Sequence, residues 1–277
     1  MTSSPLSSAA VTQVARHFVE ARRAMRALPE FPGPVPSDLA TGYATQEIAI
    51  SLWSDDVVGW KIGRVPPQYE AVLGAPRIAG PIFRRKLWTV PEGERNEAIA
   101  FPVFVGGFAA VEAEYVVRVA HDAPPGKTDW TLDEARAMTA ALHIGVEPAG
   151  SPLATINALG PTVVVSDFGN NNGLILGPEI RDWRSTPWQE LPCETWIEGS
   201  RVGTGTAASV PGGPIEALRF LLEHLAHRNR PLKAGDLVTT GAATGIHDIE
   251  AGQSAVLRFG RCGELRCKAV AAKSSEL

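Results

Sequence analysis

Two glutamates stand at alternate positions in an apolar segment, VEAEYVVRV at 111–119. Successive side chains of a β-strand point to opposite faces, so Glu112 and Glu114 share one face of the strand that this pattern predicts. Two interpretations are open at this point. Either the shared face is the polar, water-facing side of an amphipathic strand, or the two carboxylates converge on a cation.

A third carboxylate, Glu147, lies near the end of another predicted strand, HIGVEP at 143–148. Hard cations such as Mg²⁺ prefer oxygen ligands and usually keep several waters, so a few carboxylates and substrate oxygens suffice to bind one. If the two strands are neighbours, three clustered carboxylates would repel and raise one another's pKa. A divalent ion would remove that cost, and these residues therefore form a candidate metal site.

Other common site chemistries have weaker support in this sequence. The segment RVGTGTAAS at 201–209 has G-x-G without a third glycine, and the Walker pattern is absent. No G-x-S-x-G elbow or H-E-x-x-H motif occurs. His224 and His227 share a predicted helix surface but have no third ligand in view. Turns and solvated positions are the better explanation of these features.

Composition fits an ordinary globular protein. The chain has 277 residues, 44% hydrophobic and 20% charged, with a formal net charge of −4. This charge gives no support for nucleic-acid binding, and no apolar run is long enough to cross a bilayer. Three cysteines without metal spacing, Cys193, Cys262 and Cys267, fit a reducing compartment. We therefore expect a cytoplasmic protein that binds neither nucleic acid nor membrane.

The remaining elements are predicted from periodicity, capping residues and turn residues. An N-terminal amphipathic helix has Val11, Val14, Phe18 and Met25 on one face, and Ser37 or Asp38 caps a second helix. Further helices are expected after the Thr131–Glu134 capping box and after Pro214. Besides 111–119 and 143–148, strands are expected at 57–63 and 162–167, a turn-rich segment at 75–83, and a hairpin turning near 260–263.

Five segments in order give the chain a recognisable resemblance. They are GWKIG at 59–63, VEAE at 111–114, GVEP at 145–148, SDFGNNNGLILG at 166–177 and PLKAGDLVTTGAATG at 231–245. Together they resemble the 2-keto-4-pentenoate hydratase and 4-oxalocrotonate decarboxylase family, within the fumarylacetoacetate hydrolase superfamily. The resemblance implies an α+β fold with an N-terminal helical/α+β portion, residues 1–95, and a mixed β-roll catalytic core, residues 96–277.

The resemblance also implies roles for individual residues. Glu112, Glu114 and Glu147 match the ligands of a Mg²⁺ or Mn²⁺ ion, and Lys61 matches an active-site lysine. Thr244 matches a threonine that holds a substrate carboxylate, and Asp167 matches an acidic position that we assign to substrate binding.

Departures from the family pattern surround the expected substrate. Relatives commonly read E-I-x-D-S-R after the third ligand, whereas this chain has EPAGSP, with Gly150 and Pro152 replacing the Asp and Arg. Ala242 replaces a hydroxyl residue in the loop usually written TGSLTG. The segment APRIAG lacks the acidic residue of P-D-x-G. These changes leave open which oxo acid binds.

A hydratase acting on a small 2-oxo or 2-hydroxydienoic acid, of the kind used in aromatic catabolism, is the first expectation for function. The cation would stabilise an enolate, and Lys61, with its pKa lowered by burial beside the cation, would transfer protons. Decarboxylation of a 4-oxalocrotonate-type acid needs the same enolate and stays an alternative. C–C bond hydrolysis is a further alternative, although no His–Glu pair is found near Lys61. A non-catalytic assembly subunit is the alternative of another class, and a homo-oligomer is expected.

Overall fold

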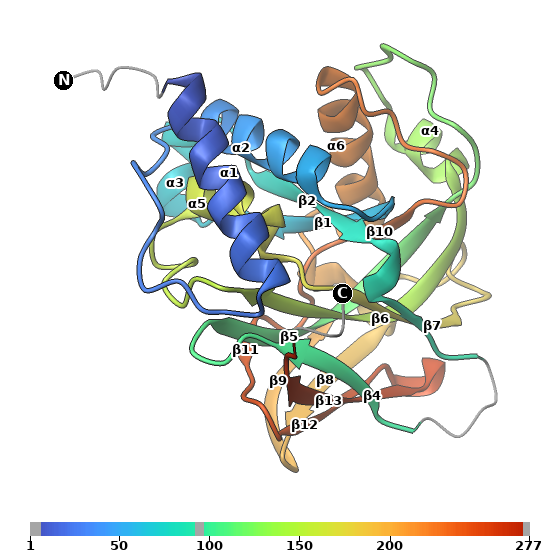
Figure 1. Ribbon diagram of the computed structural model, residues 1–277. Coiled ribbons are helices and arrows are strands. Elements are labelled where there is room, and N and C mark those ends of the chain that lie inside the picture. The colour runs from blue at the N-terminus through green and yellow to red at the C-terminus, as the bar shows by residue number, and fades with distance from the viewer. Residues whose placement is uncertain (1–6, 92–96, 274–277) are drawn as a thin grey trace.

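Two mixed β-sheets form the centre of the computed structural model, which describes residues 7–91 and 97–273 (Figure 1). The larger sheet has the order β2-β1-β10-β5-β6-β7-β3, with β11 paired to β5. Its strands are β1 (Val57–Arg64), β2 (Arg77–Phe83), β3 (Leu87–Thr89), β5 (Phe108–Val119), β6 (Thr139–Ser151), β7 (Leu174–Glu179), β10 (Leu237–Thr239) and β11 (His247–Asp248). The smaller sheet has the order β4-β13-β12-β8-β9. Its strands are β4 (Ile99–Val103), β8 (Pro192–Ile197), β9 (Ser200–Thr206), β12 (Ser254–Arg258) and β13 (Glu264–Ala271).

Helices gather at the top of Figure 1, over the larger sheet, while the smaller sheet lies below. The helices are α1 (Ser8–Arg23), α2 (Leu39–Leu52), α3 (Pro67–Leu73), α4 (Leu132–Ala137), α5 (Pro161–Ser166) and α6 (Gly213–His227). Single 3-10 turns are Arg84–Lys86, Phe168–Asn170, Trp188–Glu190, Ala207–Ser209 and Gly260–Cys262. Within the described residues, no helix combines the length and the apolar character needed to span a membrane.

Several predicted helix starts are confirmed in atomic detail. The side chain of Asp38 accepts a hydrogen bond from the Thr41 amide at 2.8 Å, which caps α2. Thr131 and Glu134 form the reciprocal capping box of α4. Pro214 lies in the first turn of α6, and the apolar face of that helix is buried. Local signals at helix starts therefore fix where these helices begin.

Two segments differ from their sequence prediction. Residues 162–167, predicted as a strand from three consecutive valines, lie almost wholly in helix α5. Gly160 and Pro161 begin this helix, and burial of every residue in it outweighs the strand preference of valine. The segment 75–83, predicted as turn-rich, instead contains the fully buried strand β2. This strand forms an edge of the sheet, where a proline is tolerated.

The longest pairing in the molecule joins β5 to β6 and brings the glutamates together. The two strands are antiparallel from Phe108, opposite Ser151, to Val119, opposite Thr139. Glu112 lies directly opposite Glu147, so both side chains point to the same face of the sheet. Glu114 lies on that face two residues further along, opposite Gly145. The ladder alone therefore groups three carboxylates.

The predicted division near residue 95 stays a prediction. Strands β1, β2 and β3 precede it, yet they belong to the same sheet as β5, β6 and β7.

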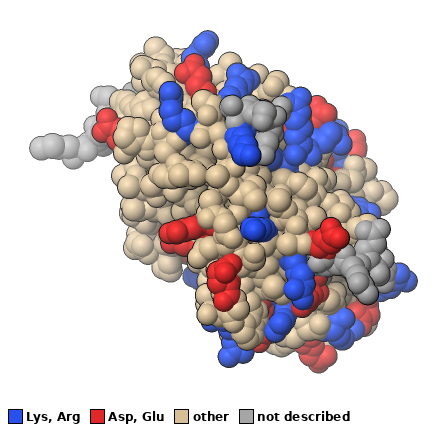
Figure 2. All heavy atoms as spheres, turned by 60° about the horizontal axis from the view of Figure 1, so that its bottom comes forward, with Lys and Arg blue, Asp and Glu red and all other residues tan. Residues whose placement is uncertain are grey.

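On the face shown in Figure 2, basic and acidic side chains are interspersed, and neither sign forms a continuous patch.

Candidate metal centre

The three glutamates form a compact, buried carboxylate cluster. One carboxylate oxygen from each of Glu112, Glu114 and Glu147 lies within 4.8 Å of the others. The exposed fractions of these residues are 3%, 0% and 0%. This burial excludes the interpretation that VEAEYVVRV turns a polar face to water. It leaves the second interpretation, in which the carboxylates converge.

Oxygen atoms of the cluster fit the needs of a hard cation. Glu112 Oε1 and Glu114 Oε1 are buried and have no hydrogen-bond partner among the described residues. Glu114 Oε2 accepts a hydrogen bond from the Gly241 amide at 2.7 Å. Unpartnered buried oxygens are costly in a folded protein, whereas a divalent cation takes oxygen ligands of this kind. The donor set therefore fits Mg²⁺ or Mn²⁺.

Protonation of the cluster reflects its burial. Burial raises the pKa of Glu112 to about 8, and the Glu147 carboxylate adds to this while Lys61 opposes it. Burial, together with Glu147 and Glu112, raises the pKa of Glu114 well above its usual range. The two carboxyls thus hold protons at pH values where exposed glutamates are ionised.

Lys61, on β1, provides the positive charge of the site. Its Nζ lies 3.2 Å from Glu147 Oε1 and donates a hydrogen bond to Asn170 Oδ1 at 3.0 Å. Burial alone would lower the pKa of Lys61, but the charges of Glu147, Glu112 and Glu114 outweigh burial, so the pKa is raised. The expectation of a lowered pKa was made for Lys61 beside a bound cation, and it stays a prediction.

Glu147 is held by groups from three elements. Its Oε2 accepts a hydrogen bond from Thr239 Oγ1 at 3.3 Å, and its Oε1 accepts one from Asn171 Nδ2 at 3.2 Å. Strand β10 lies between β1 and β5 and brings Thr239 beside Lys61. The carboxylate therefore has a fixed orientation.

A cavity of about 550 Å³ opens beside this cluster. Lys61, Glu112 and Asn170 contribute to its wall. Apolar and small residues form much of the remainder, including Ile78, Pro161, Val164, Val210 and Ala242. A small organic acid thus has room next to the carboxylates and the lysine ammonium.

The structure does not bring Thr244 and Asp167 to the described lining of this cavity. Thr244 Oγ1 instead forms a hydrogen bond with Thr195 Oγ1 at 2.7 Å. Asp167 pairs with Arg22, with Nε to Oδ1 at 2.5 Å. From the same glycine-rich loop as Thr244, Thr240 and Gly241 line the cavity. Substrate binding by Thr244 and Asp167 stays a prediction.

Four residues around the cluster were not singled out from the sequence. They are Asn170 and Asn171, which face Lys61 and Glu147, and Thr239 and Gly241, which donate to Glu147 and Glu114. Three consecutive asparagines at 170–172 were the available signal, because polar amides need partners when buried. The register of β10 could not be read from sequence in the same way.

Comparison with solved structures shows which proteins have a similar fold. The chain is similar to 4-oxalocrotonate decarboxylase from Pseudomonas putida G7, solved with magnesium and adipate, at 20% identity and a TM-score of 0.77. That alignment covers 97% of this chain and all of the other. No family model matches the sequence.

A second neighbour is fumarylpyruvate hydrolase from Pseudomonas aeruginosa, solved with Mn²⁺ and pyruvate, at 16% identity and a TM-score of 0.56. It covers 77% of this chain and 89% of its own. A third is 5-carboxymethyl-2-hydroxymuconate delta-isomerase from Mycobacterium smegmatis, at 13% identity and a TM-score of 0.54, covering 79% and 82%. The predicted fold, a mixed α and β architecture with curled sheets, is confirmed, and these solved structures share it.

Proposed function

We propose that this protein is a divalent-metal-dependent enzyme that acts on a small 2-oxo acid, and that its reaction is hydration of a 2-hydroxydienoic acid. The observation that carries the proposal is the cluster of Glu112, Glu114 and Glu147, two of whose buried oxygens have no hydrogen-bond partner among the described residues. Its position beside Lys61 and a 550 Å³ cavity supports an acid as the ligand.

Glu112, Glu114 and Glu147 would hold Mg²⁺ or Mn²⁺, and the solved neighbours with magnesium, calcium or Mn²⁺ support this choice. When bound, the cation supplies Lewis acidity toward a carboxylate and a 2-oxo oxygen. The apolar wall formed by Ile78, Val164 and Val210 suits the carbon chain of such an acid. Thr244 and Asp167 would contribute to substrate binding, as the family resemblance implies.

Lys61 would move the proton. Its Nζ reaches the cavity and is oriented by Asn170 and Glu147. In the hydratase reaction, the 2-hydroxy group of the dienol loses a proton while carbon 5 gains one, which gives an unsaturated ketone. Water then adds across that conjugated double bond, with hydroxide at carbon 4 and a proton at carbon 3. A lysine ammonium that donates and recovers a proton serves these transfers.

Decarboxylation is the second candidate. The observation that favours it is the TM-score of 0.77 to a 4-oxalocrotonate decarboxylase over the full length of that chain, against 0.56 to the hydrolase. The conjugated 2-oxo group would then accept the electron pair left when CO₂ departs, which forms the same enolate. Hydrolysis has less support, because the described lining of the cavity contains no histidine.

We also propose a homo-oligomeric assembly, as in the sequence-based expectation.

Calorimetry with Mg²⁺ and Mn²⁺ tests the proposal. Wild-type protein is expected to bind Mn²⁺, and oxalate, a mimic of the chelating end of a 2-oxo acid, is expected to bind only with the metal present. Glu114→Gln should weaken Mn²⁺ binding by more than about tenfold because a ligand oxygen loses its charge. The exposed Glu20→Gln is the matched control. Wild-type protein that binds neither Mn²⁺ nor oxalate would overturn the proposal.

A further inference from the structure

A buried arginine of helix α1 holds the turn that faces the candidate metal centre. Arg22 is 4% exposed. Its Nε and Nη2 donate to Asp167 Oδ1 and Oδ2 at 2.5 and 2.9 Å, which makes a bidentate pair. Nη2 also donates to the Gly150 carbonyl at 2.9 Å. The guanidinium thereby joins α1 to the end of α5 and to the end of β6.

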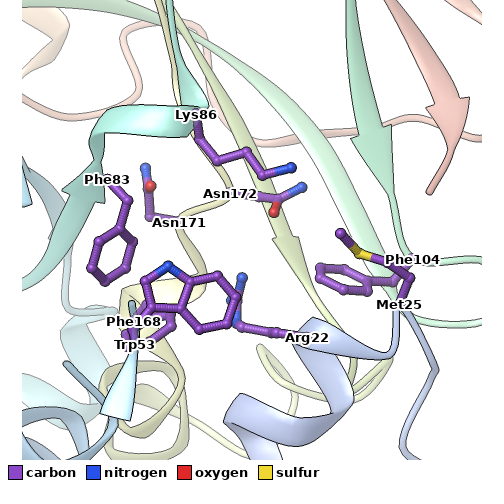
Figure 3. Close-up of a pocket in the computed structure, with 9 residues that line it drawn as sticks. All are labelled: Arg22, Met25, Trp53, Phe83, Lys86, Phe104, Phe168, Asn171 and Asn172. Atoms are coloured by element: carbon purple, nitrogen blue, oxygen red, sulfur yellow. The ribbon is translucent and has the colours of Figure 1, made fainter. Parts of the chain in front are cut away.

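Aromatic rings complete the surroundings of Arg22. The guanidinium carbon lies 5.5 Å from the centre of the Phe104 ring and 5.1 Å from that of Phe168. Figure 3 shows Arg22 rising from its helix, with Phe104 to one side and Trp53 and Phe168 to the other. The pocket drawn there has about 20 Å³, which is room for about one water molecule. Arg22 is thus placed to support structure and not to bind an organic ligand.

The turn that follows Asp167 has a backbone that needs support. Phe168, Gly169 and Asn170 have φ values of 53°, 65° and 54°, all in the left-handed region. This conformation is unfavourable for residues other than glycine and asparagine, so Phe168 stores strain. Asp167 is fixed by Arg22 and also by Ser151, whose Oγ donates to Oδ2 at 2.6 Å. This anchoring offsets the strain.

The strained turn directs two amide side chains toward the cluster. Asn170 accepts from Lys61 Nζ at 3.0 Å, and Asn171 donates to Glu147 Oε1 at 3.2 Å. Without Asn170, the Lys61 ammonium would interact with the carboxylates alone. A metal cation would then have to compete with this ammonium for the carboxylate oxygens. We propose that Arg22 is a positioning residue, which holds the turn at 168–170 so that Asn170 and Asn171 orient Lys61 and Glu147. The expected effect of Arg22 on metal binding rests on the proposed function, whereas its role in holding the turn does not.

A double-mutant cycle tests the proposal, with Mn²⁺ and oxalate as calorimetric probes. Arg22→Met is expected to weaken Mn²⁺ binding about tenfold or more, the size typical of losing a group that orients a ligand. Asn170→Gly removes the amide while permitting the left-handed backbone. If Arg22 acts through the turn, the two effects are non-additive, and the double variant binds about as well as the weaker single variant. Arg22→Lys should recover part of the affinity.

Arg23→Met is the matched control, because Arg23 is exposed on the same helix and donates to the Leu52 carbonyl. Its Mn²⁺ affinity should stay within about twofold of wild type, the range of most surface substitutions. All affinities are compared below the unfolding temperature of each variant. A folded Arg22→Met protein with wild-type affinity, or strictly additive effects in the cycle, would overturn the positioning role.

A crystal structure of Arg22→Met gives a readout that does not depend on any metal. The expected result is a turn at 168–170 that has left the left-handed region, with the contact between Asn170 and Lys61 lost. An unchanged contact would overturn the proposal. If wild-type protein binds no Mn²⁺ but the turn still moves in the variant, the proposed function fails while the structural role of Arg22 stands.

Discussion

Glu112 has two properties that conflict in a folded protein, namely complete burial and an acidic side chain. A carboxyl whose pKa rises on folding takes up a proton from the unfolded to the folded state. Its usual pKa is 4.5, and burial raises it to about 8. Between those values the folded state binds more protons than the unfolded state does. The free energy of unfolding must therefore fall as the pH rises through that window.

The direction of this change in the free energy of unfolding gives a prediction for the protein in the presence of a chelator. Urea unfolding between pH 5 and pH 8 should show stability decreasing as the pH increases, since Glu112 and Glu114 lose their protons at a cost. In Glu112→Gln the dependence should be flatter, because the amide does not ionise. A pH dependence in Glu112→Gln as steep as that of the wild type would contradict the pKa shifts described for the cluster.

Residue-level prediction from sequence succeeded where a pattern had a strong physical cause. Alternation in VEAEYVVRV placed Glu112 and Glu114 on one face, and the ladder confirms it. Lys61, found through the resemblance, does lie beside the carboxylates. The rise of its pKa beside the three carboxylates without a cation could not be read from the sequence, because it depends on distances that a sequence does not contain.

Glycines carry much of the close packing between elements around the site. A Cβ at Gly80, on β2, would lie 2.0 Å from the carbonyl oxygen of Phe168. Strand β2 and the left-handed turn therefore touch through their backbones. A side chain at this position would push against the turn that carries Asn170.

Gly80→Ala should consequently damage both stability and metal binding. Overpacking of this kind costs about 1–3 kcal/mol, seen as a lower midpoint in urea, and Mn²⁺ affinity should fall as the turn moves. Gly74→Ala is the comparison, because nothing lies within 4 Å of a Cβ there. The alanine at this position is destabilising because the backbone there is left-handed, but the variant should leave Mn²⁺ affinity unchanged. Equal Mn²⁺ affinity in both variants would argue that the contact between Gly80 and the turn at 168–170 does not affect metal binding.

Elements were predictable from sequence when local signals agreed with the final packing. Capping residues located α2 and α4, and the five family-like segments indicated the fold. Three valines before Asp167 misled the prediction, since they are buried on a helix and not in a sheet. Gly80 and the prolines at 76 and 81 misled it in the opposite way, because an edge strand accepts such residues.

At the scale of the whole molecule, the candidate centre joins distant parts of the chain. Lys61 comes from β1, the three glutamates from β5 and β6, and the Gly241 amide from the loop after β10. All of these strands belong to one sheet. Occupation of the centre should therefore stabilise the entire fold and not one segment.

Thermal unfolding tests this expectation. A ligand that binds only the folded state adds about 2.7 kcal/mol at a concentration 100 times its dissociation constant. For a chain of this size, that corresponds to a midpoint roughly 5 °C higher. Mn²⁺ should raise the midpoint of wild-type protein by this amount, EDTA should reverse it, and Glu114→Gln should show little response. A midpoint indifferent to Mn²⁺ at saturating concentration would contradict this linkage.

The long ladder between β5 and β6 bears on the order in which the molecule assembles. Its two strands are consecutive in the sheet and are joined by residues 120–138, which include α4, so pairing them closes a smaller loop than bringing in β1 or β10 does. We therefore expect the three carboxylates to meet before Lys61 and the Gly241 amide arrive. During that interval their mutual repulsion opposes the ladder. A divalent cation present at this stage would act on the rate of folding, and not only on the lifetime of the finished protein.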